Sequence, residues 1–327
     1  MRKVIVMLLS FYMLYAGSLF EFLGGQKKGT TALLFLKIAP GANQVALGNT
    51  GVSFSEDATC LYYNPALANF VKSPSSFTMT YRRWVVDQNY TYVGGIKSIG
   101  KYQRIGVYLM GLSSGYFKET DENHPEGTGD YIQSSDFAMG VVYGKNVSDR
   151  FAFGLTFKFA FENLAGVHGY TGLLDIGTLY QVGYRDIQIG VSLSNLGPDF
   201  SLKGKYLSEN GDSTSYGSYQ VPVIYRIGFK GKLKDYLQGS FEIEKPSDDV
   251  EQFKLGVSFI PVSFVNLNIG LRLNDLPPGG SFFNRGVNFG LNIKKATSLH
   301  KGFYISYAAE QMGYLGISHI ITTGVNF

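Results

Sequence analysis

The feature that most constrains this chain is an alternation of large apolar residues with small or polar ones, repeated from Phe77 onward. In the segment FAFGLTFKFAF, which begins at Phe151, the odd-numbered residues are Phe or Leu and the even-numbered ones are Ala, Gly, Thr and Lys. Successive side chains of a β-strand point to opposite faces, so this spacing predicts strands with one apolar face. The pattern recurs in residues 187–194, 265–273 and 287–293.

Two kinds of protein contain such strands. A soluble β-sandwich buries one face of each sheet and leaves the other in water. A transmembrane barrel turns large apolar residues to lipid and smaller or polar residues to its lumen. Here the face opposite the apolar one is mostly Gly, Ala, Ser and Asn. Charged residues make up only 17% of the chain, against roughly 25% in a typical soluble domain. The sequence therefore favours an all-β membrane protein.

The pattern predicts fourteen antiparallel strands whose connections alternate between long and short. Long loops on one side and short turns on the other are typical of outer-membrane barrels, and an even strand count returns the C-terminus to the periplasm. The expected strands start near residues 77, 89, 104, 131, 150, 170, 186, 219, 236, 252, 264, 282, 301 and 319. The expected long loops are residues 118–130, 162–169, 195–218, 244–251 and 274–280.

The last expected strand, HIITTGVNF, ends at Phe327 and places His319, Ile321, Thr323 and Val325 on the same face as this residue. An aromatic final residue on an alternating strand resembles the recognition signal read by outer-membrane assembly machinery. We therefore expect Phe327 to be an assembly signal and the barrel-assembly machinery to be a partner.

The first residues predict export. Arg2 and Lys3 precede an apolar run from Val4 to Ala16, and small residues follow as far as Ser18. This arrangement is typical of a signal peptide. The alternative, a membrane anchor, is disfavoured because the run is shorter than the ~20 residues that a spanning helix needs. We expect a cleaved signal peptide over residues 1–18 and a mature protein in the bacterial outer membrane.

Residues 19–74 do not follow the strand pattern, and we expect them to fill the lumen of a barrel formed by residues 75–327. Five ordered motifs occur between Phe35 and Asn69: FLKI, the Gly-Ala pair that follows it, ALGNTG, EDA and LYYNPA. Together they resemble the N-terminus of the PorV/PorQ family, which belongs to the FadL-like superfamily. Where members often have GARALGMG, this chain has GANQVALGNTG. The resemblance implies a 14-stranded barrel with an N-terminal hatch in its lumen.

The same resemblance implies two functions. Members of the PorV/PorQ family act in type IX secretion and hold exported proteins at the outer membrane. FadL-like proteins instead pass hydrophobic small molecules through a hatch-plugged barrel. A third interpretation, a soluble β-rich binding protein, is less favoured. The signal peptide, the loop asymmetry and Phe327 all indicate an outer-membrane barrel instead.

Candidate site residues lie in the hatch motif and on the lumen face of the strands. Asn64, Pro65 and Ala66, with Glu56 and Asp57, form the hatch motif. Pro65 fixes its own φ and Asn64 can bond to nearby backbone groups, so a structural turn is favoured over ligand gating. Four cations share the small-residue face of their strands, and we expect them to pair with Glu56 or Asp57 or to bias passage toward anions: Lys158, Arg226, Lys254 and Arg272.

The sequence contains little that indicates catalysis or cofactor binding. Its four His residues show no metal-ligand spacing, and no GxSxG motif occurs. The segment beginning at Asp121, DENHPEGTGD, fails the calcium-loop pattern because Pro125 occupies a ligand position. The net charge of +4 is spread along the chain, which disfavours nucleic-acid binding, and the single Cys60 forms no intrachain disulfide. We expect no enzyme activity, no cofactor and no metal.

Overall fold

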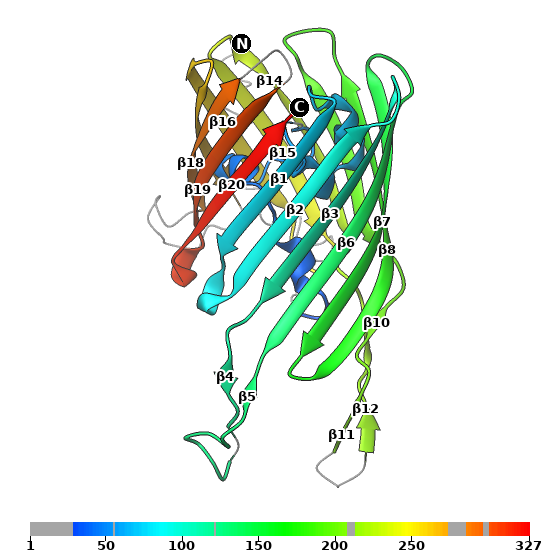
Figure 1. Ribbon diagram of the computed structural model, residues 1–327, viewed down its shortest axis with the longest axis vertical. Helices are drawn as coiled ribbons and strands as arrows, with labels where there is room; N and C mark the ends of the chain where they lie inside the picture. The colour runs from blue at the N-terminus through cyan, green and yellow to red at the C-terminus, as the bar shows by residue number, and fades with distance from the viewer. Residues whose placement is uncertain (1–28, 55, 121, 208–212, 274–285, 297–300) are drawn as a thin grey trace, which may run out of the picture.

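The computed structural model describes residues 29–54, 56–120, 122–207, 213–273, 286–296 and 301–327, so the expected signal peptide lies outside the described residues. Within the part described, fourteen antiparallel strands close into one barrel, and the last strand pairs with the first (Figure 1). The predicted all-β fold, a 14-stranded antiparallel barrel, is thereby confirmed. Around the barrel the strands are β1 (Ser75–Arg83), β2 (Asn89–Ser98), β3 (Gln103–Ser113), β6 (Ser134–Asn146), β7 (Phe151–Leu164), β8 (Val167–Gln181), β9 (Gln188–Leu196), β14 (Ile224–Lys234), β15 (Leu237–Pro246), β16 (Gln252–Val262), β17 (Val265–Arg272), β18 (Val287–Ala296), β19 (Gly302–Gln311) and β20 (Ile317–Asn326).

The two ends of the barrel differ. The end at the top of Figure 1 carries Phe327 and short connections, and we call it the turn end. Its connections are residues 99–102, 147–150, 182–187, 235–236 and 263–264. The opposite, loop end carries the connections 114–133 and 197–223. Small hairpins project from it: β4 (Phe117–Lys118) with β5 (Tyr131–Ile132), β10 (Phe200–Ser201) with β13 (Ser218–Tyr219), and β11 (Lys205–Leu207) with β12 (Ser213–Ser215). The short helices η5 (Val85–Asp87) and η7 (Gly313–Leu315) also lie at this end.

Several predicted boundaries were wrong. The loop expected at residues 162–169 is a two-residue turn, Ala165–Gly166, because β7 and β8 continue almost to its tip. Both turn residues have positive φ (51° and 91°), as in the primed turns that suit a hairpin. Tyr131 and Tyr219 belong to the small hairpins β4–β5 and β10–β13, so wall strands β6 and β14 begin later than expected. The predicted strand start at Phe282 falls outside the described residues.

The alternation of side chains follows the predicted faces. Phe157 and Phe159 point outward and are 68% and 47% exposed, whereas Thr156 and Lys158 between them are buried. An apolar exterior of this kind is stable only against lipid. No helix among the described residues is long and apolar enough to cross a membrane.

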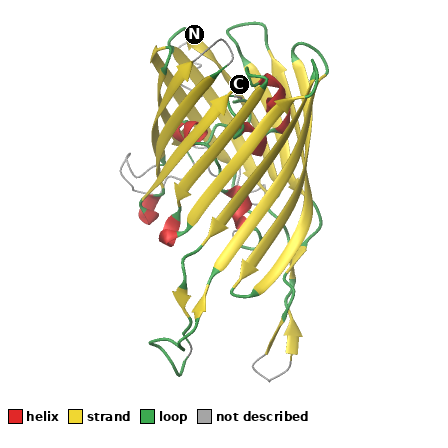
Figure 2. Cartoon of the chain, in the orientation of Figure 1, coloured by secondary structure: helices red, strands yellow, loops and turns green. Residues whose placement is uncertain are grey.

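Residues 29–54 and 56–74, which we call the inner segment, lie inside the barrel, and their helices appear within the strand wall in Figure 2. These are η3 (Leu34–Lys37), α2 (Ala42–Ala46), α3 (Cys60–Tyr63) and η4 (Pro65–Phe70). Helix α2 packs against β17 to β20, and η4 packs against β3, β6, β7 and β8. The apolar core of the molecule therefore forms between the inner segment and the wall.

Candidate functional site

The Asn64-Pro65-Ala66 motif fastens the inner segment to the wall. Asn64 is buried and extended (φ −162°), and its Oδ1 accepts a hydrogen bond from the N–H of Ala66 at 3.0 Å. Its Nδ2 donates to the carbonyl oxygens of Val52 and Thr178, both at 3.0 Å. Pro65 is the first residue of η4. The N–H group at this position makes no hydrogen bond within the helix, so its absence in proline costs nothing. Asn64 thus caps a helix and also bonds to strand β8.

Inward-facing glycines let the wall approach this motif closely. A Cβ atom on Gly177 would lie 2.0 Å from Oδ1 of Asn64, and one on Gly154 would lie 2.4 Å from the backbone N of Ala66. Both distances are far shorter than van der Waals contact. Any larger residue at these positions displaces the inner segment.

The four cations predicted to face the lumen have inward, mostly buried side chains, and each lies against a carboxylate of the wall. Nitrogen–oxygen distances in these pairs run from 2.6 to 2.9 Å. The expected pairing with Glu56 or Asp57 is wrong among the residues described, since the closest partners are carboxylates of other wall strands. The pairs are Lys158 with Asp175, Arg226 with Glu244, Lys254 with Glu244, and Arg272 with Glu310.

Carboxylates of the wall also hold the backbone of the inner segment. Oε2 of Glu242 accepts hydrogen bonds from the N–H groups of Gly51 (2.7 Å) and Val52 (2.8 Å). Oε2 of Glu162 accepts one from the N–H of Leu33 at 2.8 Å. Hydrogen bonds to the wall therefore hold the inner segment at several points along its length.

A second buried cluster lies near the loop end of β1 and β19. Arg82 and Glu310 are each 1% exposed and form an ion pair, and Arg272 lies 2.7 Å from the same carboxylate. Oε1 of Glu310 also accepts a hydrogen bond from Nδ2 of Asn49 at 3.1 Å. Arg82, Glu242 and Glu310 were missed from the sequence, although each occupies an inward position of an alternating strand, as the four cations do.

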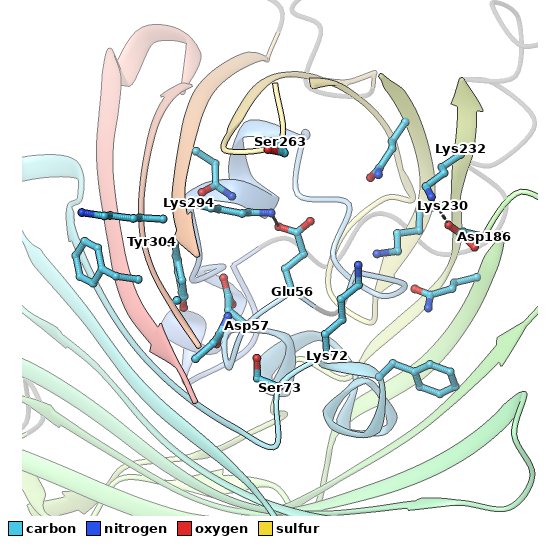
Figure 3. A pocket seen from close by; sticks show the side chains of 18 of the residues that line it. Glu56, Asp57, Lys72, Ser73, Asp186, Lys230, Lys232, Ser263, Lys294 and Tyr304 are labelled. Atoms are coloured by element: carbon cyan, nitrogen blue, oxygen red, sulfur yellow. Dashed lines mark hydrogen bonds and ion pairs between the residues drawn. The ribbon is translucent and has the colours of Figure 1, made fainter. Parts of the chain in front are cut away.

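Glu56 and Asp57 lie at the turn end of the lumen, beside a cavity of about 700 Å³ (Figure 3). Oε2 of Glu56 lies 2.7 Å from Nζ of Lys294 on β18. Burial opposes ionisation of Glu56, but the nearby ammonium groups of Lys294, Lys230 and Lys72 outweigh it and hold the pKa of this carboxyl below its usual value.

Asp57 behaves differently, although it is the next residue. Burial raises the pKa of its carboxyl, and hydrogen bonds from the amide and hydroxyl of Thr59 only partly offset this. The two neighbouring carboxyls thus shift in opposite directions, and Glu56 is the one that pairs with a lysine of the cavity.

The terminal residue closes the wall. The N–H of Phe327 donates to the carbonyl of Ser75 at 3.0 Å, and its own carbonyl accepts from the N–H of Ser75 at 2.8 Å. Its side chain is 53% exposed. Phe327 thus stands at the turn end of the seam between the first and last strands.

Solved structures with the same architecture include two toluene transporters and a FadL homologue. The Ralstonia pickettii toluene transporter TbuX is 12% identical, with a TM-score of 0.60 over 88% of this chain and 97% of the transporter. The Pseudomonas putida toluene transporter TodX is 14% identical (TM-score 0.58; 88% and 96% covered). A Pseudomonas aeruginosa FadL homologue is 9% identical (TM-score 0.58; 88% and 98% covered). At these identities the likeness shows the fold, a FadL-like outer-membrane barrel.

Sequence comparison identifies the family. No curated protein matches the chain significantly. The family model described as "Type IX secretion system protein PorV" matches residues 24–206, more than half of the 327 residues and including the whole inner segment. With the barrel and its filled lumen on the same chain, this match shows that the protein belongs to the PorV family of outer-membrane proteins.

Proposed function

We propose that this protein acts without catalysis in type IX secretion and holds exported proteins at its loop end, while the inner segment closes the lumen as a hatch. The family match supports the secretion role. The hatch role is supported by the bonds that tie the inner segment to the wall at Asn64, Gly51, Val52 and Leu33.

The observation that carries the proposal is a group of exposed aromatic side chains on the projecting hairpins. Tyr116, Phe117 and Tyr131 are 73%, 44% and 62% exposed and lie on the connection beyond β3. Tyr219, on the second projection, is 43% exposed. Aromatic side chains on an exposed surface are typical contacts for a protein partner. These hairpins point away from the turn end, which faces the periplasm in barrels of this kind.

Replacing Tyr116, Phe117 and Tyr131 together by Ser is expected to abolish capture of exported proteins. The reason is loss of the apolar contact area, since truncating a central aromatic contact costs about 2 kcal/mol or more, roughly thirtyfold in affinity. The measurement is the amount of exported protein that co-purifies with the barrel from the outer membrane.

The matched control is Tyr184→Ser, which removes a 61% exposed aromatic from the turn end and should leave capture unchanged. Normal capture by the triple variant, in a barrel that still assembles, would rule out the hairpins as the docking surface.

A small loop-end cavity favours a second candidate function, passage of hydrophobic small molecules. It measures about 220 Å³ and is lined by apolar side chains of Phe117, Ile132 and Leu164, among others. Native mass spectrometry of the detergent-purified protein separates the two functions. A bound exported protein supports secretion, and a bound small apolar molecule supports transport.

We further infer that residues 1–18 are removed on export and that Phe327 is read by the barrel-assembly machinery. The charged and apolar pattern of the first residues and the position of Phe327 at the seam support these two inferences. The intact mass of the purified protein should correspond to a chain that begins near residue 19. Phe327→Ala is expected to reduce the amount of folded barrel in the outer membrane severalfold, measured by heat-dependent gel migration, whereas Phe264→Ala at the same end is not.

A further inference from the structure

The cavity at the turn end holds more positive than negative charge. Two of its lysines are paired: Lys294 with Glu56 at 2.7 Å and Lys232 with Asp186 at 2.5 Å. Neither Lys72 nor Lys230 has a carboxylate within ion-pair distance among the described residues. The lysines that line the cavity are Lys72, Lys230, Lys232, Lys294, Lys295 and Lys301, and the carboxylates are Glu56, Asp57 and Asp186.

The lysines come from separate parts of the chain and converge on one space. Lys72 follows η4 at the end of the inner segment, Lys230 lies on β14, and Lys294 lies on β18 across the lumen. Figure 3 shows their side chains directed toward the region around Glu56. Like charges gathered in a recess repel one another, and a recess lined by one sign of charge attracts the opposite ion. Asp186 pairs with Lys232, and the two remaining carboxylates, Glu56 and Asp57, compensate this group only in part.

The residue types and the volume indicate the class of ligand. A lysine ammonium is a compact point charge that binds phosphate groups without imposing bidentate geometry. A cavity of about 700 Å³ lies within the range of small-molecule sites. It has room for a phosphate that carries an organic group.

We propose that the turn-end cavity binds a phosphate-bearing anion between Lys72, Lys230 and Lys294, in competition with the carboxylate of Glu56. The ligand is a free phosphate compound or a lipid headgroup, since both present the same chemistry to these lysines. The site is independent of the secretion role, because it lies at the opposite end of the barrel from the hairpins.

The test is calorimetric titration of the full, detergent-purified protein with inorganic pyrophosphate at low ionic strength. The wild-type protein is expected to bind saturably, and binding should weaken at high salt because charge pairing is screened. Lys230→Gln and Lys294→Gln should each weaken binding about tenfold, since each removes one charged contact. Glu56→Gln should strengthen binding, because it removes the competing carboxylate.

The matched control is Lys97→Gln, which removes the same charge from an exposed position near the turn end of β2, outside the cavity. Its affinity should equal that of the wild type. Heat-dependent gel migration verifies that every variant is folded. The proposal fails if neither the wild type nor Glu56→Gln binds saturably, or if Lys97→Gln weakens binding as much as Lys230→Gln.

Pyrophosphate affinity measured in lipid nanodiscs distinguishes the two possible sources of the phosphate, a lipid headgroup and a free phosphate compound. If a headgroup is the natural occupant, nanodiscs that contain phosphatidylglycerol should reduce pyrophosphate affinity relative to phosphatidylcholine alone. If the natural occupant is a free phosphate compound, the affinity is equal in both. Either result retains the site.

Discussion

Gly154→Val is expected to drive the inner segment off the wall and open the barrel to ions. The added Cβ would meet the backbone N of Ala66 and the backbone C of Pro65, both at 2.4 Å. These are main-chain atoms, so no side-chain rotation relieves the overlap, and η4 has to move away from β7. Overpacking of this kind costs about 1–3 kcal/mol of folding free energy. The measurements are ion conductance in planar bilayers, which should rise, and the urea concentration of unfolding, which should fall.

Gly172→Val provides the matched control for this substitution. Gly172 lies on the neighbouring strand β8 but faces outward, and an added Cβ there would meet nothing within 4 Å. Its conductance should equal that of the wild type. A Gly154→Val barrel that stays closed and equally stable would show that the inner segment is not held against β7.

Glu310→Ala is expected to lower the free energy of unfolding by about 3–5 kcal/mol, the usual cost of leaving a buried charge without its partner. Arg82, which is 1% exposed, would lose its carboxylate, and Asn49 of the inner segment would lose an acceptor. The double variant Arg82→Met, Glu310→Met should recover part of the loss, because no uncompensated guanidinium then remains at position 82. Urea-dependent gel migration or tryptophan fluorescence measures the change.

The exposed pair Arg83–Asp87 is the control for the buried one. Its side chains are 67% and 79% exposed, so water screens the interaction. Asp87→Ala should leave the urea midpoint unchanged. An equal loss of stability in Asp87→Ala and Glu310→Ala would contradict the role assigned to burial.

The strands were predictable because the alternation of apolar with small or polar residues is a local pattern. It indicates which face of the strand each side chain occupies, whatever the rest of the chain does. Strands β1, β2, β7 and β16 begin within two residues of their predicted starts. Boundaries failed at β6 and β14, where the projecting hairpins carry apolar residues of their own. Locally, a hairpin strand and a wall strand show the same pattern.

The partners of the inward cations were not predictable, because partnership depends on register between strands. In the strand register, Arg226 lies directly opposite Glu244. Lys254 lies opposite Glu242, at 3.7 Å, and reaches Glu244 on the same strand at 2.9 Å. A shift of one residue would turn each of these side chains to the other face. Contacts of the inner segment, such as Glu56 with Lys294, were still less accessible, since that segment has no periodicity from which its path follows.

The two-residue turn between β7 and β8 makes the rim of the barrel uneven. Strands β6, β7 and β8 have 13, 14 and 15 residues, whereas β1 has 9 and β20 has 10. A tilted strand needs about 9–11 residues to cross the hydrocarbon core. The longer strands therefore exceed this requirement, and they reach further toward the loop end than β1 and β20 do (Figure 1). The wall is therefore taller at β6, β7 and β8 than at β1 and β20. The rim therefore has no rotational symmetry about the barrel axis, and each orientation of a molecule placed on it would make different contacts.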